Sequence, residues 1–128
     1  MVGIIITGHG HYASGLASAV TLLNGPAEAF AAVDFVQGDG VEDLRAKLGA
    51  AIEALPGEAV LLLVDLVGGT PFNVAAQFLV DGIGRPLKIV AGCNLTIATQ
   101  LVFEREDSPL EALVAAAVEE GKNGIVSL

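Results

Sequence analysis

A histidine held between two glycines is the residue of this chain best placed to do chemistry. His9 follows a short apolar run and is flanked by Gly8 and Gly10. Glycine has no side chain to crowd its neighbours and adopts positive φ at little cost, so another molecule can approach this imidazole closely. A neutral imidazole nitrogen is a nucleophile near neutral pH. We therefore take His9 as the candidate reactive group.

A second set of polar residues follows another apolar run, which Asp65 ends. Gly68, Gly69 and Thr70 come next, just before Pro71. Threonine is a common helix N-cap and proline a common first helical residue, so we expect a helix to begin here with Thr70 as its N-cap. The start of such a helix offers backbone N–H groups and a positive dipole end to an anionic group.

These two sets of residues would form one chemical site if the fold brought them together. A carboxylate at Asp65 that accepts a hydrogen bond from one nitrogen of His9 fixes the tautomer, leaves the other nitrogen free as a nucleophile, and stabilises positive charge on the ring. Thr70 and the N–H groups of Gly68 and Gly69 would hold the oxygens of an anionic group. These are the parts of a phosphohistidine site.

Each of these residues also has a purely structural explanation. His9 could be a turn residue whose imidazole is satisfied locally, Asp65 could only cap a helix, and residues 68–71 could be only a turn and a cap. His11 fits a surface or supporting position better than a catalytic one. Cys93 is interpreted as a small turn or core residue, because no second cysteine accompanies it to indicate a metal site. The two loops together favour a site over these separate explanations.

The segments that must position these residues alternate between strand and helix patterns. Strands are expected at residues 2–7, 30–36, 59–64 and 87–91, with a short last edge strand at residues 125–128. Helical spacing of apolar residues is found at residues 12–23, 41–55, 71–79 and 109–118, and a further helical segment is expected after residue 94, ending near residue 106. Asp39 with Glu42, and Ser108 before Pro109, predict two of the helix starts.

This alternation predicts an α/β fold of three layers, α/β/α, with a mostly parallel sheet. In such a sheet the ends of the first and third strands can be neighbours at the topological switch point, where ligands bind. That arrangement would bring His9 and Asp65 together.

Composition narrows the class of protein further. The 128 residues predict one domain, and although 53% of them are hydrophobic, no apolar run approaches the roughly 20 residues that span a bilayer. No basic region precedes the first apolar run, so we expect no signal peptide and a cytoplasmic protein. Six basic against fifteen acidic residues give a net charge of −9, which argues against a nucleic acid as partner.

Three segments together resemble a known protein family. They are GIIITGHGHYASGL at residues 3–16, LVDLVGGTPFN at residues 63–73 and IVAGCNL at residues 89–95. They are similar to the IIA component of the mannose-family sugar phosphotransferase systems (PTS), and the resemblance spans essentially the whole chain.

The resemblance implies a flavodoxin-like fold over residues 1–128 and a cytoplasmic phosphocarrier. His9 matches the histidine that accepts a phosphoryl group from the phosphohistidine of HPr and passes it to a IIB component, here expected to be a separate protein. Asp65 matches the acid that orients this histidine, and Thr70 matches a hydroxyl residue that contacts the phosphoryl group. The resemblance further implies a homodimer in which the terminal strand pairs with the partner's sheet. It also implies service to a membrane IIC/IID transporter of the mannose, fructose, sorbose or N-acetylgalactosamine class.

Two alternatives use the same fold. A related domain feeds phosphoryl groups to dihydroxyacetone kinase, so that the acceptor would differ while the His9 chemistry stayed the same. The chain could also be a flavodoxin-like regulatory module in which His9 is never phosphorylated. No Gly-x-x-x-x-Gly-Lys-Ser/Thr loop and no evident acidic metal cluster occur in the sequence, so we expect neither cofactor nor metal and no direct use of Mg-ATP.

Overall fold

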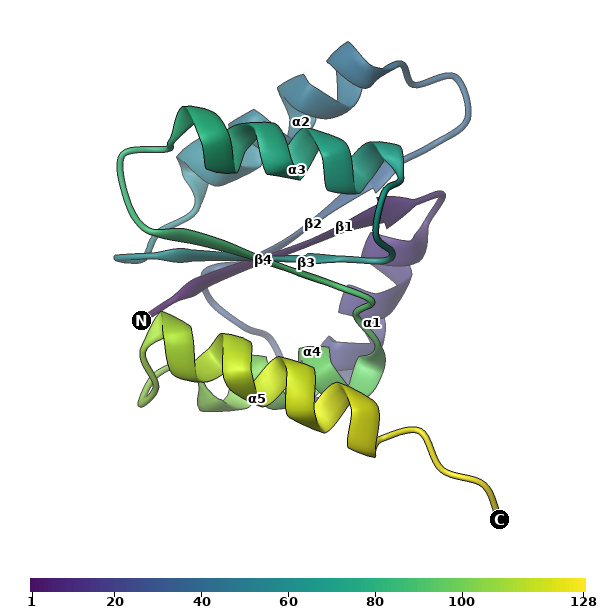
Figure 1. Cartoon of the computed structure of the whole chain (residues 1–128), viewed down its shortest axis with the longest axis vertical. Helices are drawn as coiled ribbons and strands as arrows, with labels where there is room; N and C mark the ends of the chain where they lie inside the picture. Colours follow the sequence, from purple (N-terminus) through teal and green to yellow (C-terminus); the bar gives the residue numbers. More distant parts are fainter.

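A parallel sheet of four strands lies between two layers of helices in the computed structural model, which describes all 128 residues (Figure 1). The strands are β1 (Gly3–His9), β2 (Phe30–Phe35), β3 (Val60–Val64) and β4 (Leu87–Ala91). The helices are α1 (Tyr12–Asn24), α2 (Val41–Ala54), α3 (Thr70–Asp81), α4 (Leu95–Glu104) and α5 (Leu110–Asn123). Strand and helix alternate from β1 to α4, as the sequence predicts.

The strand order β2-β1-β3-β4 places β1 and β3 at the centre of the sheet. All three pairings are parallel, and Thr7 of β1 lies opposite both Val33 of β2 and Val64 of β3. β2, which follows β1 in the sequence, pairs with one edge of β1, and β3, which comes next, pairs with the other edge. The topological switch point therefore falls between the ends of β1 and β3.

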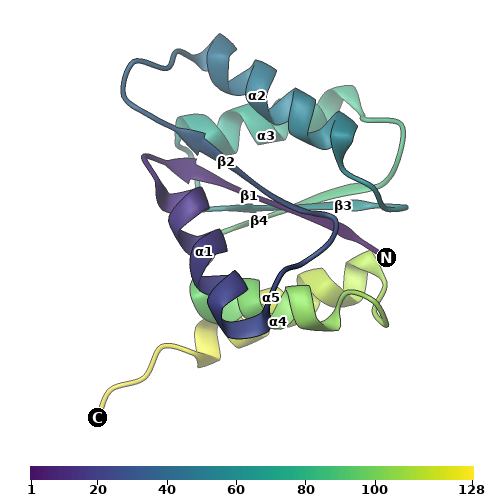
Figure 2. The same cartoon turned by 180° about the vertical axis from the view of Figure 1, so that it is seen from behind.

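The central strands are buried on both faces, and successive residues alternate between two apolar cores. One core lies under α1, α4 and α5 and contains Ile4, Ile6, Leu61 and Leu63. The other lies under α2 and α3 and contains Ile5 and Leu62. Figures 1 and 2 show these two helix layers on opposite faces of the sheet. The expected three-layer α/β/α fold is confirmed.

The expected edge strand at residues 125–128 is not formed within the chain. α5 ends at Asn123, and the last residues run away from the body of the molecule (Figures 1 and 2). The side chains of Ile125 and Val126 are each 78% exposed. A strand needs a neighbour to pair its backbone groups, and this tail has none in the single chain. The prediction of a terminal strand inside this subunit was therefore wrong.

Three helix starts also differ from the sequence prediction. α3 begins at Thr70 with Gly69 as its N-cap, one residue earlier than expected. α5 begins at Leu110 with Pro109 as its N-cap, one residue later than the predicted Ser108 cap. At α2, the Asp43 carboxylate accepts the Gly40 N–H at 2.7 Å, in place of the expected Asp39 and Glu42 pair. None of the helices is both long enough and apolar enough to cross a membrane.

Candidate functional site

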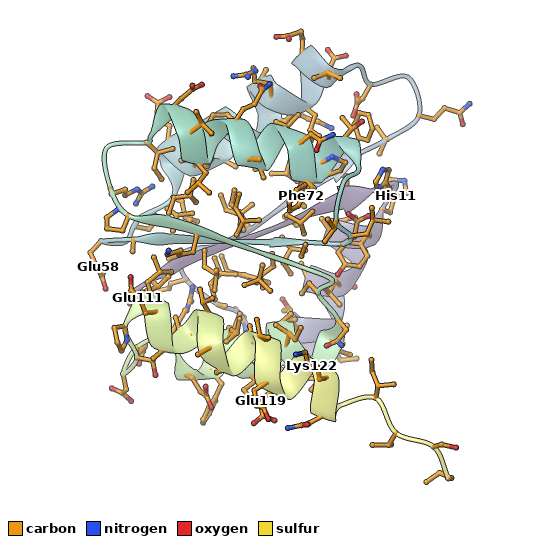
Figure 3. The ribbon with its side chains drawn as sticks, in the orientation of Figure 1. His11, Glu58, Phe72, Glu111, Glu119 and Lys122 are labelled. Carbon is orange, nitrogen blue, oxygen red and sulfur yellow. The ribbon has the colours of Figure 1, made fainter.

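His9 and Asp65 lie at one edge of the sheet because the two central strands end there together. His9 is the last residue of β1, and Asp65 follows the last residue of β3. The register aligns Thr7 with Val64, so the next residues of both strands emerge at the same edge. Figure 3 shows the neighbouring His11 at this edge and Glu58 at the opposite one. The sequence prediction that the fold brings His9 and Asp65 together is confirmed.

The imidazole of His9 is held by one carboxylate oxygen. Asp65 Oδ2 lies 2.7 Å from His9 Nδ1 and also accepts the backbone N–H of His9 at 2.9 Å. The second oxygen, Oδ1, accepts the backbone N–H of Leu66 at 2.9 Å. The Asp65 side chain is 11% exposed, whereas the His9 side chain is 46% exposed. The carboxylate is thus fixed beneath a ring that remains open to solvent.

The ionisation of Asp65 determines which nitrogen of His9 is free. Burial raises the pKa of Asp65, but hydrogen bonds from His9 and Leu66 outweigh burial and leave this pKa below its usual value. Asp65 is therefore ionised at neutral pH and can only accept hydrogen bonds. Nδ1 of His9 must then carry the proton of the shared bond, which leaves Nε2 with a free lone pair.

The start of α3 lies directly beside the His9 ring. A Cβ atom added at Gly69 would lie 2.6 Å from His9 Cε1 and 3.2 Å from Nε2, so only glycine fits there without moving the ring. Gly68 has φ +84° in the turn before the helix. No side chain caps the first turn of α3, where Thr70 is half-buried. The helix start predicted as an anion-binding element is thus adjacent to the free nitrogen of His9.

Two aromatic residues near His9 were missed by the sequence analysis. The Phe35 ring meets the imidazole edge-on, with the ring centroids 6.0 Å apart. Phe35 pairs with His9 in the β1/β2 register, a relation that needs the strand order. Tyr12, the first residue of α1, donates its hydroxyl to the Cys93 carbonyl. Cys93 is buried, as predicted, and burial raises the pKa of its thiol to about 11.

His11 belongs to a separate hydrogen-bonded group on the β2 side of the turn. Its Nδ1 lies 3.2 Å from Asp34 Oδ2, and its side chain is 82% exposed. Ser14 donates its backbone N–H and its hydroxyl to the same carboxylate, at 2.9 and 2.6 Å. This agrees with the interpretation of His11 as a surface or supporting residue.

Comparison with known proteins agrees with the fold and with the segments that carry the site. Residues 3–118 match the model of the EIIA-man family, described as the PTS system fructose IIA component. This chain belongs to the EIIA-man family. The match includes all four strands and both loops that bear His9 and Asp65.

Relatives within the EIIA-man family differ in length from this chain. It is 36% identical to the PTS system mannose-specific EIIAB component of Escherichia coli (strain K12), over 99% of this chain and 39% of that protein. The PTS system fructose-specific EIIA component of Bacillus subtilis (strain 168) is 35% identical over 89% of this chain and 77% of its own length. The chain thus spans about two-fifths of the E. coli relative and most of the B. subtilis one.

Solved structures place the chain in the same fold. The crystal structure of phosphotransferase system component EIIA from Streptococcus agalactiae superposes with a TM-score of 0.91 at 30% identity, covering 99% of this chain and 97% of that one. A mannose/sorbose specific IIA subunit from Enterococcus faecalis gives a TM-score of 0.80 at 29% identity, with 98% and 93% covered. These EIIA structures therefore share the three-layer α/β/α fold of this chain.

Proposed function

We propose that this protein is a cytoplasmic phosphocarrier of a sugar phosphotransferase system. In this proposal His9 accepts a phosphoryl group from phospho-HPr and passes it to a IIB component, which supplies a membrane IIC/IID transporter. PTS EIIA components are phosphotransferases that carry phosphoryl groups between PTS proteins, and the relatives named above include mannose, fructose and mannose/sorbose members. The sugar class of this chain is proposed to lie within that range.

The single observation that carries the proposal is the bond between His9 Nδ1 and the buried, ionised Asp65. It supports a ring that in its neutral form has Nε2 free, on a side chain that is 46% exposed and held by a fixed partner. His11 also meets a carboxylate, that of Asp34, but at 3.2 Å and with 82% of its side chain exposed. Asp65 Oδ2, in contrast, lies 2.7 Å from His9 Nδ1 and also accepts the His9 backbone N–H. The Asp65 carboxylate would stabilise the positive charge that forms on the ring when Nε2 bonds to phosphorus.

The proposed transfer is a displacement at phosphorus between two imidazoles. Nε2 of His9 donates its lone pair to phosphorus as the bond from phosphorus to the donor's histidine nitrogen breaks. The donor ring, protonated on its other nitrogen, takes the electron pair of that bond and leaves as a neutral imidazole. No proton needs to move at His9, because Nδ1 keeps its proton in the bond to Asp65. Catalysis then rests on alignment of the two rings and on charge stabilisation. Onward transfer to IIB is the same step with His9 as the leaving group.

The turn from Gly68 to Thr70 is the proposed support for the phosphoryl oxygens. Backbone N–H groups at the start of α3 have no intrahelical partner, and no side chain caps them. They lie beside Nε2, as the closeness of Gly69 to the ring indicates. The positive end of the helix dipole would favour the negative charge of the equatorial oxygens.

The donor and acceptor are proposed to present basic surfaces around their own reactive groups. The net charge of −9 would attract such partners and speed their encounter. We also propose a homodimer as the working form, in which the exposed tail at residues 125–128 pairs with the partner subunit's sheet.

Phosphoryl uptake tests the proposal directly. The protein is incubated with Enzyme I, HPr and phosphoenolpyruvate, and its intact mass is measured at neutral to alkaline pH, because phosphohistidine is acid-labile. We expect one phosphoryl adduct per chain that is lost after acid treatment. The adduct should be absent from His9→Ala and present in His11→Gln, which is the matched control because both histidines lie in the same turn.

Two results would contradict the proposal. A folded wild-type protein that gains no adduct from an active donor would favour the regulatory module without phosphoryl chemistry. An adduct that survives in His9→Ala would place the acceptor elsewhere. Transfer from the phosphorylated protein to a IIB component, compared with transfer to a dihydroxyacetone kinase subunit, identifies the acceptor.

A further inference from the structure

Tyr12 connects the turn that carries His9 to the loop that follows β4. Its hydroxyl donates to the backbone carbonyl of Cys93 at 2.5 Å, across 81 residues of sequence. Cys93 in turn donates its backbone N–H to the carbonyl of Val64, the last residue of β3, at 3.1 Å. The phenol is therefore tied, through one loop residue, to the strand end that presents Asp65. Figure 2 shows the short turn that joins β1 to α1, and Tyr12 is the first residue of α1.

The ring of Tyr12 and the Asp65 carboxylate both border the space over Gly8. A Cβ atom added at Gly8 would lie 2.6 Å from Tyr12 Cδ1 and 2.9 Å from Asp65 Cγ. The ring and the carboxylate thus occupy the space that a side chain at position 8 would fill. Burial, followed by the neighbouring Cys93 and Asp65, raises the pKa of Tyr12 far above its usual value. The phenol is therefore neutral at physiological pH and donates its proton to the hydrogen bond with the Cys93 carbonyl.

We propose that Tyr12 is a positioning residue of the His9–Asp65 pair: its aromatic ring, which borders the same space over Gly8 as Asp65, keeps that carboxylate on His9 Nδ1. The Asp65 side chain is only 11% exposed although it lies at the edge of the sheet, and the Tyr12 ring is close to it across the space over Gly8. Without the ring, water would reach the carboxylate and compete for the hydrogen bond to the imidazole. The expected effect of Tyr12 on phosphoryl transfer rests on the proposed function, whereas its expected effect on the tautomer of His9 does not.

The tautomer of His9 is the readout that a purely structural role of Tyr12 would not change. The chain has two histidines, so a His11→Gln background leaves His9 as the only imidazole. In this background, ¹⁵N NMR at pH 8 should report a protonated Nδ1 and an unprotonated Nε2. Tyr12→Leu and Tyr12→Met keep an apolar side chain at the start of α1 but lack the aromatic ring. We expect both variants to give a mixture of the two tautomers.

Two matched variants separate positioning from general packing. Tyr12→Phe keeps the ring and should retain the wild-type tautomer, because the ring is the group that lies close to Asp65. Leu16→Ala removes a partly buried side chain of the same helix, so it should lower stability while leaving the tautomer unchanged. Phosphoryl transfer from phospho-HPr should fall about tenfold or more in Tyr12→Leu, since small misplacements of a reacting group can cost up to about 10²-fold. Tyr12→Phe should stay within about threefold of wild type.

The outcomes distinguish this inference from the proposed function. A wild-type tautomer in folded Tyr12→Leu and Tyr12→Met would overturn the positioning role, and so would a mixed tautomer in Tyr12→Phe. Failure of the wild-type protein to accept a phosphoryl group would reject the proposed function alone. The NMR comparison would still decide the role of Tyr12, because it needs no donor.

Discussion

One oxygen of Asp65 accepts both the ring N–H and the backbone N–H of His9, so a single carboxylate fixes the position and the orientation of the imidazole. The bond to the ring is one of the hydrogen bonds that lower the pKa of this carboxylate, beside those from the backbone N–H groups of His9 and Leu66. Orientation of the ring and stabilisation of charge are therefore one interaction. In the proposed transfer, Asp65 therefore supports the chemistry of His9.

Removal of the carboxylate tests that dependence. Asp65→Ala leaves the His9 ring without its acceptor, so we expect phosphoryl transfer from phospho-HPr to slow by about 10²-fold or more. The fold should persist, because Asp65 lies at the edge of the sheet and outside both apolar cores. Rapid-quench measurement of a single turnover gives the rate, and circular dichroism checks the fold. A wild-type rate in Asp65→Ala would remove the orienting role.

Gly69 allows a sharper steric test of the same ring. Its φ of −82° is accessible to alanine, so Gly69→Ala brings no backbone strain. The added methyl group would lie 2.6 Å from His9 Cε1 and must push the ring aside. We expect transfer to fall at least tenfold with thermal stability nearly unchanged. Gly15→Ala is the matched control, because a Cβ atom added at Gly15 would meet no other atom within 4 Å. Gly82 does not serve as a control, because its φ of +81° would strain an alanine.

Unimpaired transfer in Gly69→Ala would contradict the geometry at the start of α3. The added methyl group would also lie 3.1 Å from Leu66 Cδ1, an exposed side chain that can move, so a large loss of stability in the same variant would contradict the expected local effect. Gly15→Ala should transfer at the wild-type rate and be at least as stable as wild type, because Gly15 lies within α1 and alanine favours a helix over glycine.

At the scale of elements, α1 begins without a cap from its own sequence. Its N-cap residue His11 makes no side-chain cap hydrogen bond. The third helical residue, Ser14, instead donates its backbone N–H to Asp34, which lies on β2. A strand thus supplies the acceptor that a capping side chain normally provides. This contact ties α1 to β2 just beyond the turn that carries His9.

Loss of this cap should lower stability in a pH-dependent way. Burial raises the pKa of Asp34, but hydrogen bonds from Ser14 and His11 outweigh burial, and the pKa lies below its usual value of 3.8. The ionised carboxylate therefore stabilises the fold above about pH 4, and this contribution is lost as pH falls through the folded-state pKa. We expect Asp34→Ala to lower the free energy of unfolding by about 1 kcal/mol at pH 7.

Urea unfolding of wild type and Asp34→Ala between pH 7 and pH 2.5 measures this difference. The gap between the two proteins should be constant near neutral pH and should narrow below about pH 4. The exposed Asp107 is the control, because its side chain makes no hydrogen bond within the chain and Asp107→Ala should change little. A gap that is equally large at pH 2.5 would mean that the effect of Asp34 is not electrostatic.

The elements differ in how far the sequence alone could predict them. Apolar runs and helical spacing predicted all four strands and five helices, because these patterns report burial within each segment. Parallel order and the switch point then brought His9 and Asp65 together. The contacts that cross the fold could not be predicted in this way. The Tyr12 hydroxyl donates to the Cys93 carbonyl, and the buried Arg105 donates to the carbonyls of Glu28 and Ala29. The partners in these contacts are more than 70 residues apart in the sequence, so no local pattern indicates them.

The prediction of a strand at residues 125–128 was wrong for a related reason. Its four residues have strand-like composition, but a strand exists only when a neighbour pairs with it. Composition cannot say whether that neighbour belongs to the same subunit or to another. The same limit applies to Phe35, whose contact with His9 follows from strand order and not from sequence spacing.

At the scale of the whole molecule, the exposed tail and the open edge of β4 remain unpaired in the single chain. β4 pairs only with β3, so its other edge presents free backbone groups. Ile125 and Val126 are largely exposed at the end of the chain. An open edge strand and an extended apolar segment are each prone to pair with another chain. Both features support the proposed homodimer.

Removal of residues 125–128 tests the role of the tail. We expect the wild-type protein to be a dimer at micromolar concentration and the truncated protein to be a monomer with an unchanged circular dichroism spectrum. Light scattering coupled to size exclusion measures the mass of each. Replacement of the four residues by serines is the control for chain length, and it should also give a monomer. A dimer that survives truncation, or a wild-type monomer, would contradict the proposal.

The atom that receives the phosphoryl group tests the account most directly. Asp65 occupies Nδ1 of His9, so the phosphoryl group should be bonded to Nε2. ¹⁵N and ³¹P NMR of the uniformly ¹⁵N-labelled, phosphorylated protein in the His11→Gln background identifies the bonded nitrogen from its chemical shift and its coupling to phosphorus. We predict a phosphoryl group on Nε2 and a proton on Nδ1. A phosphoryl group on Nδ1 would mean that the bond between His9 and Asp65 is not the interaction that prepares the histidine for transfer.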